Sequence, residues 1–270
     1  MQGKTPLVGL VTDFGLRDHY VGVMKAVLVS LCQDIRIVDI THDVSPQNVS
    51  EGAFLLWASY KYFPTGAVIV AVVDPGVGGS RGIIGVKTEK HTFLAPNNGL
   101  LDMMLWEEHV TEATTIRLEK AATRSVLPGL ISSTFHGRDV FAPLAAHLAQ
   151  GTRLDSLGAK TRVNWVQAPF LEKDSSELTA KVLHVDTFGN VVTNIRSNVP
   201  GVRSRLLSLR VGRRRIRTWA DAYESIATGS ISLIVGSSGL VEIVMNRRSA
   251  ASYLGLRHND DLHIEFKEGR

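Results

Sequence analysis

The chain has 270 residues, which is enough for one large domain or two ordinary ones. Hydrophobic residues make up 44% and charged residues 21%, the balance of a soluble globular protein, and the net charge of +4 permits an anionic partner without demanding one. The single cysteine, Cys32, excludes an internal disulfide and a cysteine-based zinc cluster, and it fits a reducing cytoplasm. We expect no signal peptide and no membrane span, because no apolar run reaches about 18 residues.

The first part of the chain alternates strand patterns with helical ones. LVGLVTDFG, IRIVDITHD and AVIVAVVDPG read as strands, and the last is a continuous apolar run typical of a parallel strand covered on both faces. The helix expected after the first strand has these residues inward: Val21, Met24, Leu28 and Leu31. A second helix is predicted to begin with Ser45 as its N-cap and Pro46 in its first turn. A third is predicted over FHGRDVFAPLAAHLAQ, and Gly151 lies just past its end.

Composition changes after this third helix. The stretch NWVQAPFLEKDSSE reads as a linker, and short strand patterns with turn signals follow it: LTAKVLHVD, NVVTNIR, SRLLSLRVG, RRIRTWA, SISLIVGSSG, LVEIVMN and DLHIEFK. The sequence therefore predicts an α/β domain with a mainly parallel sheet over residues 1–165. A smaller all-β, barrel-like domain is predicted over residues 176–270.

The glycine-rich stretch VVDPGVGGSRG resembles a phosphate-binding loop at first sight. It lacks the GK[ST] ending of a P-loop and the glycine spacing of a dinucleotide fingerprint. What remains is a strand that delivers Asp74 into a loop at the sheet edge where open α/β sheets build their sites. The alternative is that Asp74 merely caps its own turn.

Two further segments place reactive residues at the ends of elements. VTDFG ends a strand at Asp13, whose carboxylate suits a ribose diol, although a cap for the helix near His19 is the structural alternative. STFHGRD places His136 before a helix, where it suits chemistry or is simply a surface histidine. Arg138 and Asp139 beside it form either part of this site or a salt bridge that positions the loop.

The second domain offers binding groups rather than reactive ones. DTFGNVVTNI carries Asn190, which has the donor and acceptor that an adenine edge requires. The hairpin-like SSGLVEIVMNRRSAAS has small residues that let a ligand approach the backbone. RVGRRRIR alternates with apolar residues like an exposed strand face and has no aromatic platform, so we expect no nucleic acid there. Histidines and acids lack metal-site spacing, so no metal is expected.

Taken together, VTDFGLRDHYVGVMKAVL, VVDPGVGGSR, APNNGL, TFHGRDVFAP, DTFGNVVTNI and SSGLVEI resemble the S-adenosyl-L-methionine hydroxide adenosyltransferases, relatives of the fluorinases and chlorinases. The resemblance covers nearly the whole chain in the same order. It implies a homotrimer in which ligand binds between the N-terminal domain of one subunit and the C-terminal domain of its neighbour. The implied reaction is hydrolysis of S-adenosyl-L-methionine to adenosine and L-methionine, with no cofactor besides the substrate.

The resemblance also implies roles for particular residues. The catalytic trio corresponds to Asp74, Arg81 and His136, which would hold the attacking water. Asp13 corresponds to the acid that binds the ribose hydroxyls. The other implied substrate-binding positions are Phe135, Asp186, Phe188, Asn190, Ser237, Glu242 and Ala250.

Two other functions stay open at this point. Halogenating relatives displace methionine with a halide, but they carry tyrosine and threonine where this chain has Asp74 and Val77, and fluorinases carry serine at the place of Gly137. An anionic Asp74 would repel a halide. The second alternative is a protein that binds adenosine or S-adenosyl-L-methionine without turnover, which would have no need of the trio.

Overall fold

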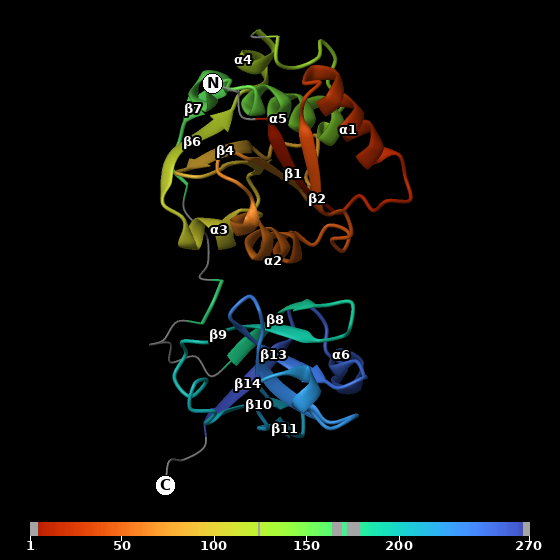
Figure 1. Ribbon diagram of the computed structural model, residues 1–270. Coiled ribbons are helices and arrows are strands. Elements are labelled where there is room, and N and C mark those ends of the chain that lie inside the picture. The colour runs from red at the N-terminus through yellow and green to blue at the C-terminus, as the bar shows by residue number, and fades with distance from the viewer. Residues whose placement is uncertain (1–4, 124, 164–168, 172–178, 267–270) are drawn as a thin grey trace. The chain divides into compact units, whose positions relative to one another are not determined.

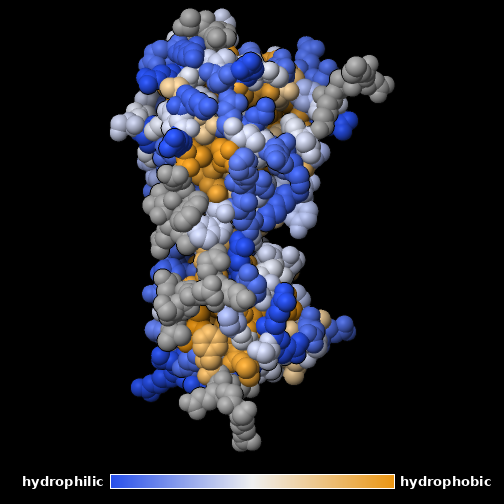
Figure 2. Space-filling view, turned by 90° about the vertical axis from the view of Figure 1, so that its left-hand side faces the viewer, coloured by the Kyte–Doolittle hydropathy of each residue, from blue (hydrophilic) through white to orange (hydrophobic). Residues whose placement is uncertain are grey.

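The computed structural model describes residues 5–123, 125–163, 169–171 and 179–266. The chain divides into two compact units, Met1–Gln167 and Ala168–Arg270. Most of the predicted linker, and the predicted boundary between residues 165 and 176, lie outside the described residues. Among the described residues no helix is long and apolar enough to cross a membrane. Hydrophilic residues cover most of the face in Figure 2, and hydrophobic ones appear there in limited patches.

The N-terminal unit has a mixed seven-stranded sheet in the order β2-β1-β3-β5-β4-β6-β7. β1, β2, β3, β5 and β6 point one way, and β4 and β7 point the other way. The sheet is thus mostly parallel, but antiparallel pairing extends it beyond β5. The strands are β1 (Leu7–Thr12), β2 (Arg36–Thr41), β3 (Val68–Val72), β4 (Ile83–Thr88), β5 (Thr92–Pro96), β6 (Val110–Ile116) and β7 (Gly158–Lys160).

Helices cover both faces of this sheet (Figure 1). α1 and α5 pack on one face, where Met24, Leu28 and Leu144 join the alternate residues of β1 and β3 in a core. α2 and α3 lie on the opposite face. The helical elements are α1 (Tyr20–Leu31), α2 (Val49–Ser59), η1 (Tyr60–Tyr62), α3 (Asp102–Glu107), α4 (Leu118–Thr123), η2 (Gly137–Phe141), α5 (Ala142–Ala149) and η3 (Leu154–Leu157).

Two details of the predicted helices are wrong. Leu31 is 41% exposed, although it lies at the end of the predicted apolar face of α1. α2 begins at Val49 with Asn48 as its N-cap, whose side-chain oxygen accepts from the Glu51 amide. Ser45 lies outside the helix because the intervening Gln47 has a left-handed backbone (φ 64°).

The C-terminal unit is an antiparallel sheet of seven strands in the order β11-β10-β14-β8-β9-β13-β12. The segment after β11 pairs with Leu233 of β12, through the Leu233 amide to Thr218 and the Ala220 amide to Leu233. The sheet thereby becomes a nearly closed barrel. Its elements are β8 (Thr179–Val185), β9 (Val191–Arg196), β10 (Leu207–Val211), β11 (Arg214–Ile216), η4 (Tyr223–Ser225), β12 (Ile231–Val235), β13 (Leu240–Met245), α6 (Ala250–Leu254) and β14 (Asp261–Phe266).

Candidate active site

Two predicted site acids leave the sheet at the same edge. β1 and β3 are parallel neighbours, and Thr12 pairs with Val72. Asp13 follows the first strand directly, and Asp74 comes two residues after the second. Because the carboxyl ends of parallel strands meet at one edge of a sheet, the register brings both acids to that edge.

The predicted trio is brought together in the N-terminal unit. The Arg81 guanidinium donates through Nε to Asp74 Oδ1 at 2.9 Å, and its terminal nitrogen forms a shorter contact with Asp74 Oδ2. The same nitrogen lies 2.8 Å from His136 Nδ1. The side chains of Asp74 and Arg81 are only 5% and 13% exposed, and His136 is 6% exposed. Arg81 therefore links a carboxylate and an imidazole, and all three side chains are largely buried.

The contact with Arg81 also fixes the state of His136. A guanidinium can only donate, so Nδ1 must accept, and the neutral ring carries its proton on Nε2. Burial lowers the pKa of His136, and the Arg81 charge lowers it further, while Asp74 and Asp139 act in the opposite direction. The imidazole is therefore neutral at neutral pH and presents Nε2–H as a donor.

Close backbone packing holds the two loops that carry the trio. A Cβ at Gly78, which has φ +76°, would lie 2.2 Å from the Ser133 carbonyl oxygen, so only glycine fits there. Asp139 accepts from the Ser132 amide at 2.8 Å and from the Arg138 guanidinium, which lowers the pKa of Asp139. This pair has the positioning role that the sequence left open.

A cavity of about 370 Å³ adjoins Arg81 and His136. Its wall contains polar backbone groups and apolar side chains. They come from the glycine-rich loop, β4, and the segments on either side of α4. The lining residues are Gly78, Gly79, Arg81, Gly82, Ile83, Ile116, Leu118, Ile131, Ser132, Ser133 and His136. The cavity gives a small molecule access to the guanidinium and the imidazole.

Phe135 belongs to an aromatic cluster that the sequence did not reveal. Its ring meets Tyr20 edge-on at 5.0 Å and Phe14 at 6.0 Å between centroids. The Arg138 guanidinium lies 5.3 Å from the Phe135 centroid. Tyr20 begins α1, and only its proximity in the fold connects it with residue 135. The cluster places a half-exposed aromatic surface beside the trio.

Asp13 does not cap α1, whose N-cap His19 has no side-chain capping bond. Instead, Asp13 Oδ2 accepts from the Gln47 amide at 2.8 Å. The left-handed backbone of Gln47 turns this amide toward the acid. The structural alternative considered for Asp13 is therefore wrong.

The predicted residues of the C-terminal unit gather around the turn between β8 and β9. Asp186 Oδ1 accepts from the amides of Phe188 and Asn190, and Oδ2 accepts from the Asn190 side chain at 2.9 Å. Asn190 is 6% exposed, whereas the Phe188 ring is 80% exposed. Asp186 thus fixes the amide orientation of Asn190 and holds the turn that presents Phe188 to solvent.

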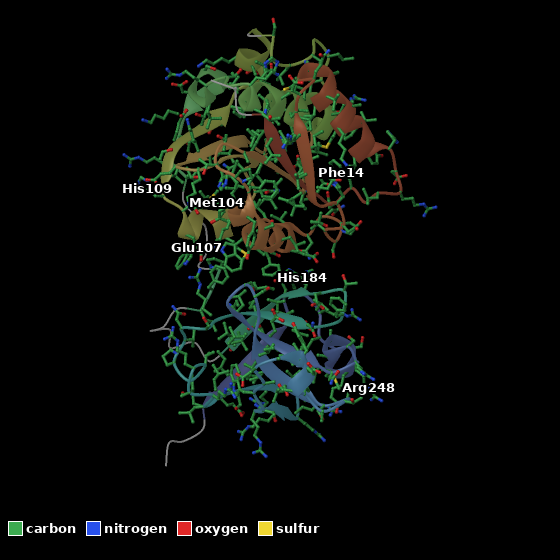
Figure 3. All side chains as sticks on the ribbon, in the orientation of Figure 1. Phe14, Met104, Glu107, His109, His184 and Arg248 are labelled. Carbon is green, nitrogen blue, oxygen red and sulfur yellow. The ribbon has the colours of Figure 1, made fainter. Side chains whose placement is uncertain are left out.

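These residues line a pocket of about 550 Å³ together with residues that the sequence analysis missed. The complete lining is Asp186, Phe188, Asn190, Tyr223, Met245, Asn246, Arg247, Arg248 and Ser249. Arg248 appears beside α6 in Figure 3. The stretch SSGLVEIVMNRRSAAS indicated this region, but Tyr223 comes from a segment with no recognisable motif.

Three predicted residues lie outside that lining. Ser237 is exposed in the turn between β12 and β13, and Ala250 is fully buried at the start of α6. Glu242 is 8% exposed and accepts from the Tyr223 hydroxyl at 3.2 Å. Burial raises the pKa of Glu242, the Tyr223 hydrogen bond lowers it, and Asp186 raises it again. Glu242 therefore lies outside the lining and holds the hydroxyl of Tyr223, which lines the pocket.

The basic strand has the form expected of an exposed face. Arg210 and Arg215 both pair with Glu265, and the Arg214 guanidinium lies over the Tyr253 ring at 4.4 Å. Within the described part of the chain, histidine, cysteine and acidic residues form no group of three that would hold a metal ion.

The chain is similar to known proteins over nearly its whole length. An (R)-S-adenosyl-L-methionine hydrolase from Thermus thermophilus is 37% identical over 93% of this chain and 96% of its own length. A fluorinase from Actinopolyspora mzabensis is 30% identical over 96% and 97%. The crystal structure of an uncharacterized conserved protein from Thermotoga maritima superimposes with a TM-score of 0.85 at 36% identity, covering 96% of this chain and all of that one.

Models of one protein family match both units. The N-terminal domain of the SAM hydroxide adenosyltransferases matches residues 8–158, and their C-terminal domain matches residues 180–263. With both domains present in order, the chain belongs to the SAM hydroxide adenosyltransferase family.

Proposed function

We propose that this protein hydrolyses S-adenosyl-L-methionine to adenosine and L-methionine, by attack of water on the ribose 5′ carbon. The observation that carries the proposal is the bonding of Arg81 to Asp74 and His136 at once, beside a cavity. Several relatives that match over most of this chain are named (R)-S-adenosyl-L-methionine hydrolase, which supports the same reaction.

The geometry supports a division of work within the trio. The Nε2–H of neutral His136 donates to the water oxygen and orients its remaining lone pair toward the 5′ carbon. Asp74 keeps acceptor capacity beyond its bonds to Arg81, so it accepts a hydrogen bond, and then the proton, from the attacking water. The Arg81 guanidinium stabilises the hydroxide character that develops on this oxygen.

The step balances in atoms and charge. The C5′–O bond forms as the C5′–S bond breaks, methionine leaves as a neutral thioether, and the proton passes through Asp74 to solvent. An oxygen nucleophile with developing negative charge meets a sulfonium cation, so charge is neutralised in the transition state. A site with little water favours such a step over bulk solution.

Substrate recognition follows the family resemblance. We propose that Asp13 binds the ribose hydroxyls, Asn190 the adenine edge, and Asp186 the amino group of methionine. Ser237 would bind the methionine carboxylate, Phe135 and Phe188 would flank the nucleoside, and the buried Glu242 and Ala250 would shape the pocket. The active form would be a cytoplasmic homotrimer with sites between subunits, and it would need no other cofactor, nucleic acid or membrane.

Halide displacement is the competing reaction, since fluorinases are relatives of this chain. Two observations favour water instead. Asp74 places a carboxylate beside the nucleophile position, which repels a halide. A Cβ at Gly137 would lie 3.0 Å from Met24 Sδ, Phe135 Cε2 and Phe14 Cε2, so this packing leaves little room for a hydroxyl-bearing side chain.

The test incubates the pure protein with S-adenosyl-L-methionine in H₂¹⁸O and identifies the products by chromatography and mass spectrometry. One heavy oxygen should enter adenosine and none should enter methionine. Added chloride or fluoride should yield no halogenated nucleoside. Absence of adenosine would instead support a binding protein without turnover.

Variants connect that activity with the trio. Asp74→Ala, Arg81→Ala and His136→Ala should each lower kcat/KM by roughly 100-fold or more, the size typical of lost electrostatic or acid–base groups. The matched control is Asp155→Ala, which removes the acid of an exposed Arg153–Asp155 pair in the same unit and should leave the rate unchanged. Wild-type turnover in the three variants would overturn the assignment.

A further inference from the structure

A chain of polar contacts runs from the surface of the N-terminal unit to the residue before Asp13. His42 is 3% exposed, and its Nδ1 lies 2.8 Å from the hydroxyl oxygen of Thr12, which is fully buried. Its Nε2 lies 3.1 Å from Asp39 Oδ1, close enough for an ion pair but off the line of a good hydrogen bond. Asp39 Oδ2 in turn contacts Lys25 Nζ of α1 at 2.5 Å.

Each proton in the buried part of this chain can be assigned. The Thr12 hydroxyl oxygen accepts from the Phe14 amide at 3.2 Å. Because the Asp39 carboxylate faces Nε2 of His42, the imidazole proton is best placed there, and the Thr12 hydroxyl donates to Nδ1. Although burial disfavours the charge of Asp39, the hydrogen bond from Lys25 and the close contact with His42 lower the pKa of this carboxyl group. A carboxylate therefore faces the imidazole proton.

The same histidine segment holds the turn that carries Asp13. The Gly15 amide donates to the His42 carbonyl at 2.7 Å, and the Val44 amide lies 3.4 Å from the Thr12 carbonyl. Asp13 Oδ2 is bound by the Gln47 amide, while Oδ1 has no hydrogen-bond partner among the described residues. The turn is thus fixed on both sides of Asp13, and one carboxylate oxygen stays available.

We propose that His42 is a positioning residue for ribose recognition. By accepting from Thr12, it orients the turn from residue 12 to residue 15 so that the free oxygen of Asp13 meets the ribose diol. This inference rests on the proposed function, because it takes the ribose as the partner of Asp13. Removal of His42 leaves the buried Thr12 hydroxyl without its acceptor, which costs free energy until the turn rearranges.

The test measures ligand binding rather than turnover. Isothermal titration calorimetry compares adenosine with 2′,3′-dideoxyadenosine, which lacks the diol. In His42→Ala the affinity for adenosine should fall roughly tenfold, the cost of one weakened hydrogen bond to a charged group. The affinity for the dideoxy compound should stay within about twofold of wild type. His42→Asn, whose side-chain oxygen can replace Nδ1 as acceptor, should recover part of the loss.

His91→Ala is the matched control, because His91 is also a buried histidine of this unit, 4% exposed and bonded to the Phe63 carbonyl. It should lower the melting temperature while leaving the ratio of the two affinities unchanged. If His42→Ala leaves the ratio of the adenosine and dideoxyadenosine affinities as in wild type, because both affinities fall equally or neither falls, the inference is overturned. If the wild-type protein itself does not prefer adenosine, the ribose role of Asp13 fails, and this inference fails with it.

Discussion

Arg81 controls the protonation of His136, and this coupling can be measured directly. Burial lowers the pKa of His136 most, the positive charge of Arg81 lowers it further, and Asp74 raises it. In Arg81→Met the lowering charge is gone and the unpaired Asp74 carboxylate remains, so the pKa of His136 should rise above its wild-type value. NMR titration of the imidazole resonances measures it. Arg153→Met, which removes an exposed arginine of the same unit, should not move it, and a lowered pKa in Arg81→Met would contradict the contact.

The buried carboxyl group of Glu242 should destabilise the folded protein at neutral pH. Its pKa is raised in the folded state, mainly by burial, above the value of about 4.5 that we take for the unfolded chain. The protonated carboxyl group of Glu242 costs no stability below about pH 4.5. As the pH rises through the folded pKa, the unfolded state ionises more readily than the folded one, so the free energy of unfolding falls. Glu242→Gln keeps an acceptor for Tyr223 and removes the charge. Calorimetry should show a higher melting temperature than wild type at pH 7 and no difference at pH 4. A gain that is larger at pH 4 would contradict this reasoning.

Residues at the ends of elements were the ones that sequence reasoning could find. Asp13, Asp74 and His136 follow strands or precede a helix, and those ends converge by the rules of parallel sheets. Tyr223 follows no such rule and was not predicted, and Glu242, inside β13, was indicated only by the family resemblance. Glu242 fits only because position 236 is glycine, where a Cβ would lie 1.7 Å from its Oε1. Such a close approach depends on the folded backbone and leaves no periodic pattern.

At the scale of elements, the glycine-rich loop should tolerate no side chain at Gly78, where it packs against the loop that contains Ser133. Gly78→Ala would force a Cβ against the Ser133 carbonyl at a left-handed backbone position. We expect a loss of at least about 2 kcal/mol in unfolding free energy, or a displaced loop with strongly reduced activity. Chemical denaturation and kinetics measure both. Gly129→Ala, where a Cβ meets open space, should change neither. Wild-type stability and activity in Gly78→Ala would show that the loops do not pack this way.

Element predictions succeeded where hydrophobic periodicity was strong and failed where long-range contacts decided. All seven strands expected in the C-terminal unit are present. In the N-terminal unit β6 and the three-residue β7 went unpredicted. VTEATTI is polar, and β6 owes its place to pairing with β4 and β7. The π-helical start of the predicted third helix, η2, is a change of hydrogen-bond register that residue spacing does not show. The start of α2 was misplaced because Gln47 bonds to Asp13, 34 residues earlier.

At the scale of the whole molecule, the proposed site is divided between two units of different architecture. The α/β unit carries Asp13, Asp74, Arg81 and His136, while the barrel carries Asp186 and Asn190. In the proposed mechanism the trio activates water and the adenine is bound elsewhere, and the pocket around Asn190 holds no comparable trio among its lining residues. Under the proposed function, catalysis would draw on residues of both units, and the proposed trimer would supply them from different copies.

Complementation between inactive variants tests this arrangement. Asp74→Ala damages the half-site of the α/β unit and Asn190→Ala that of the barrel, so each homogeneous trimer should be inactive. In co-expressed, randomly mixed trimers, about one quarter of intersubunit sites should combine two intact halves, and hydrolysis should return to about that fraction of wild type. Asp74→Ala co-expressed with Arg81→Ala is the control, because both changes damage the same half and no site becomes whole. If the two halves of each site came from one chain, the first pair would stay as inactive as the control.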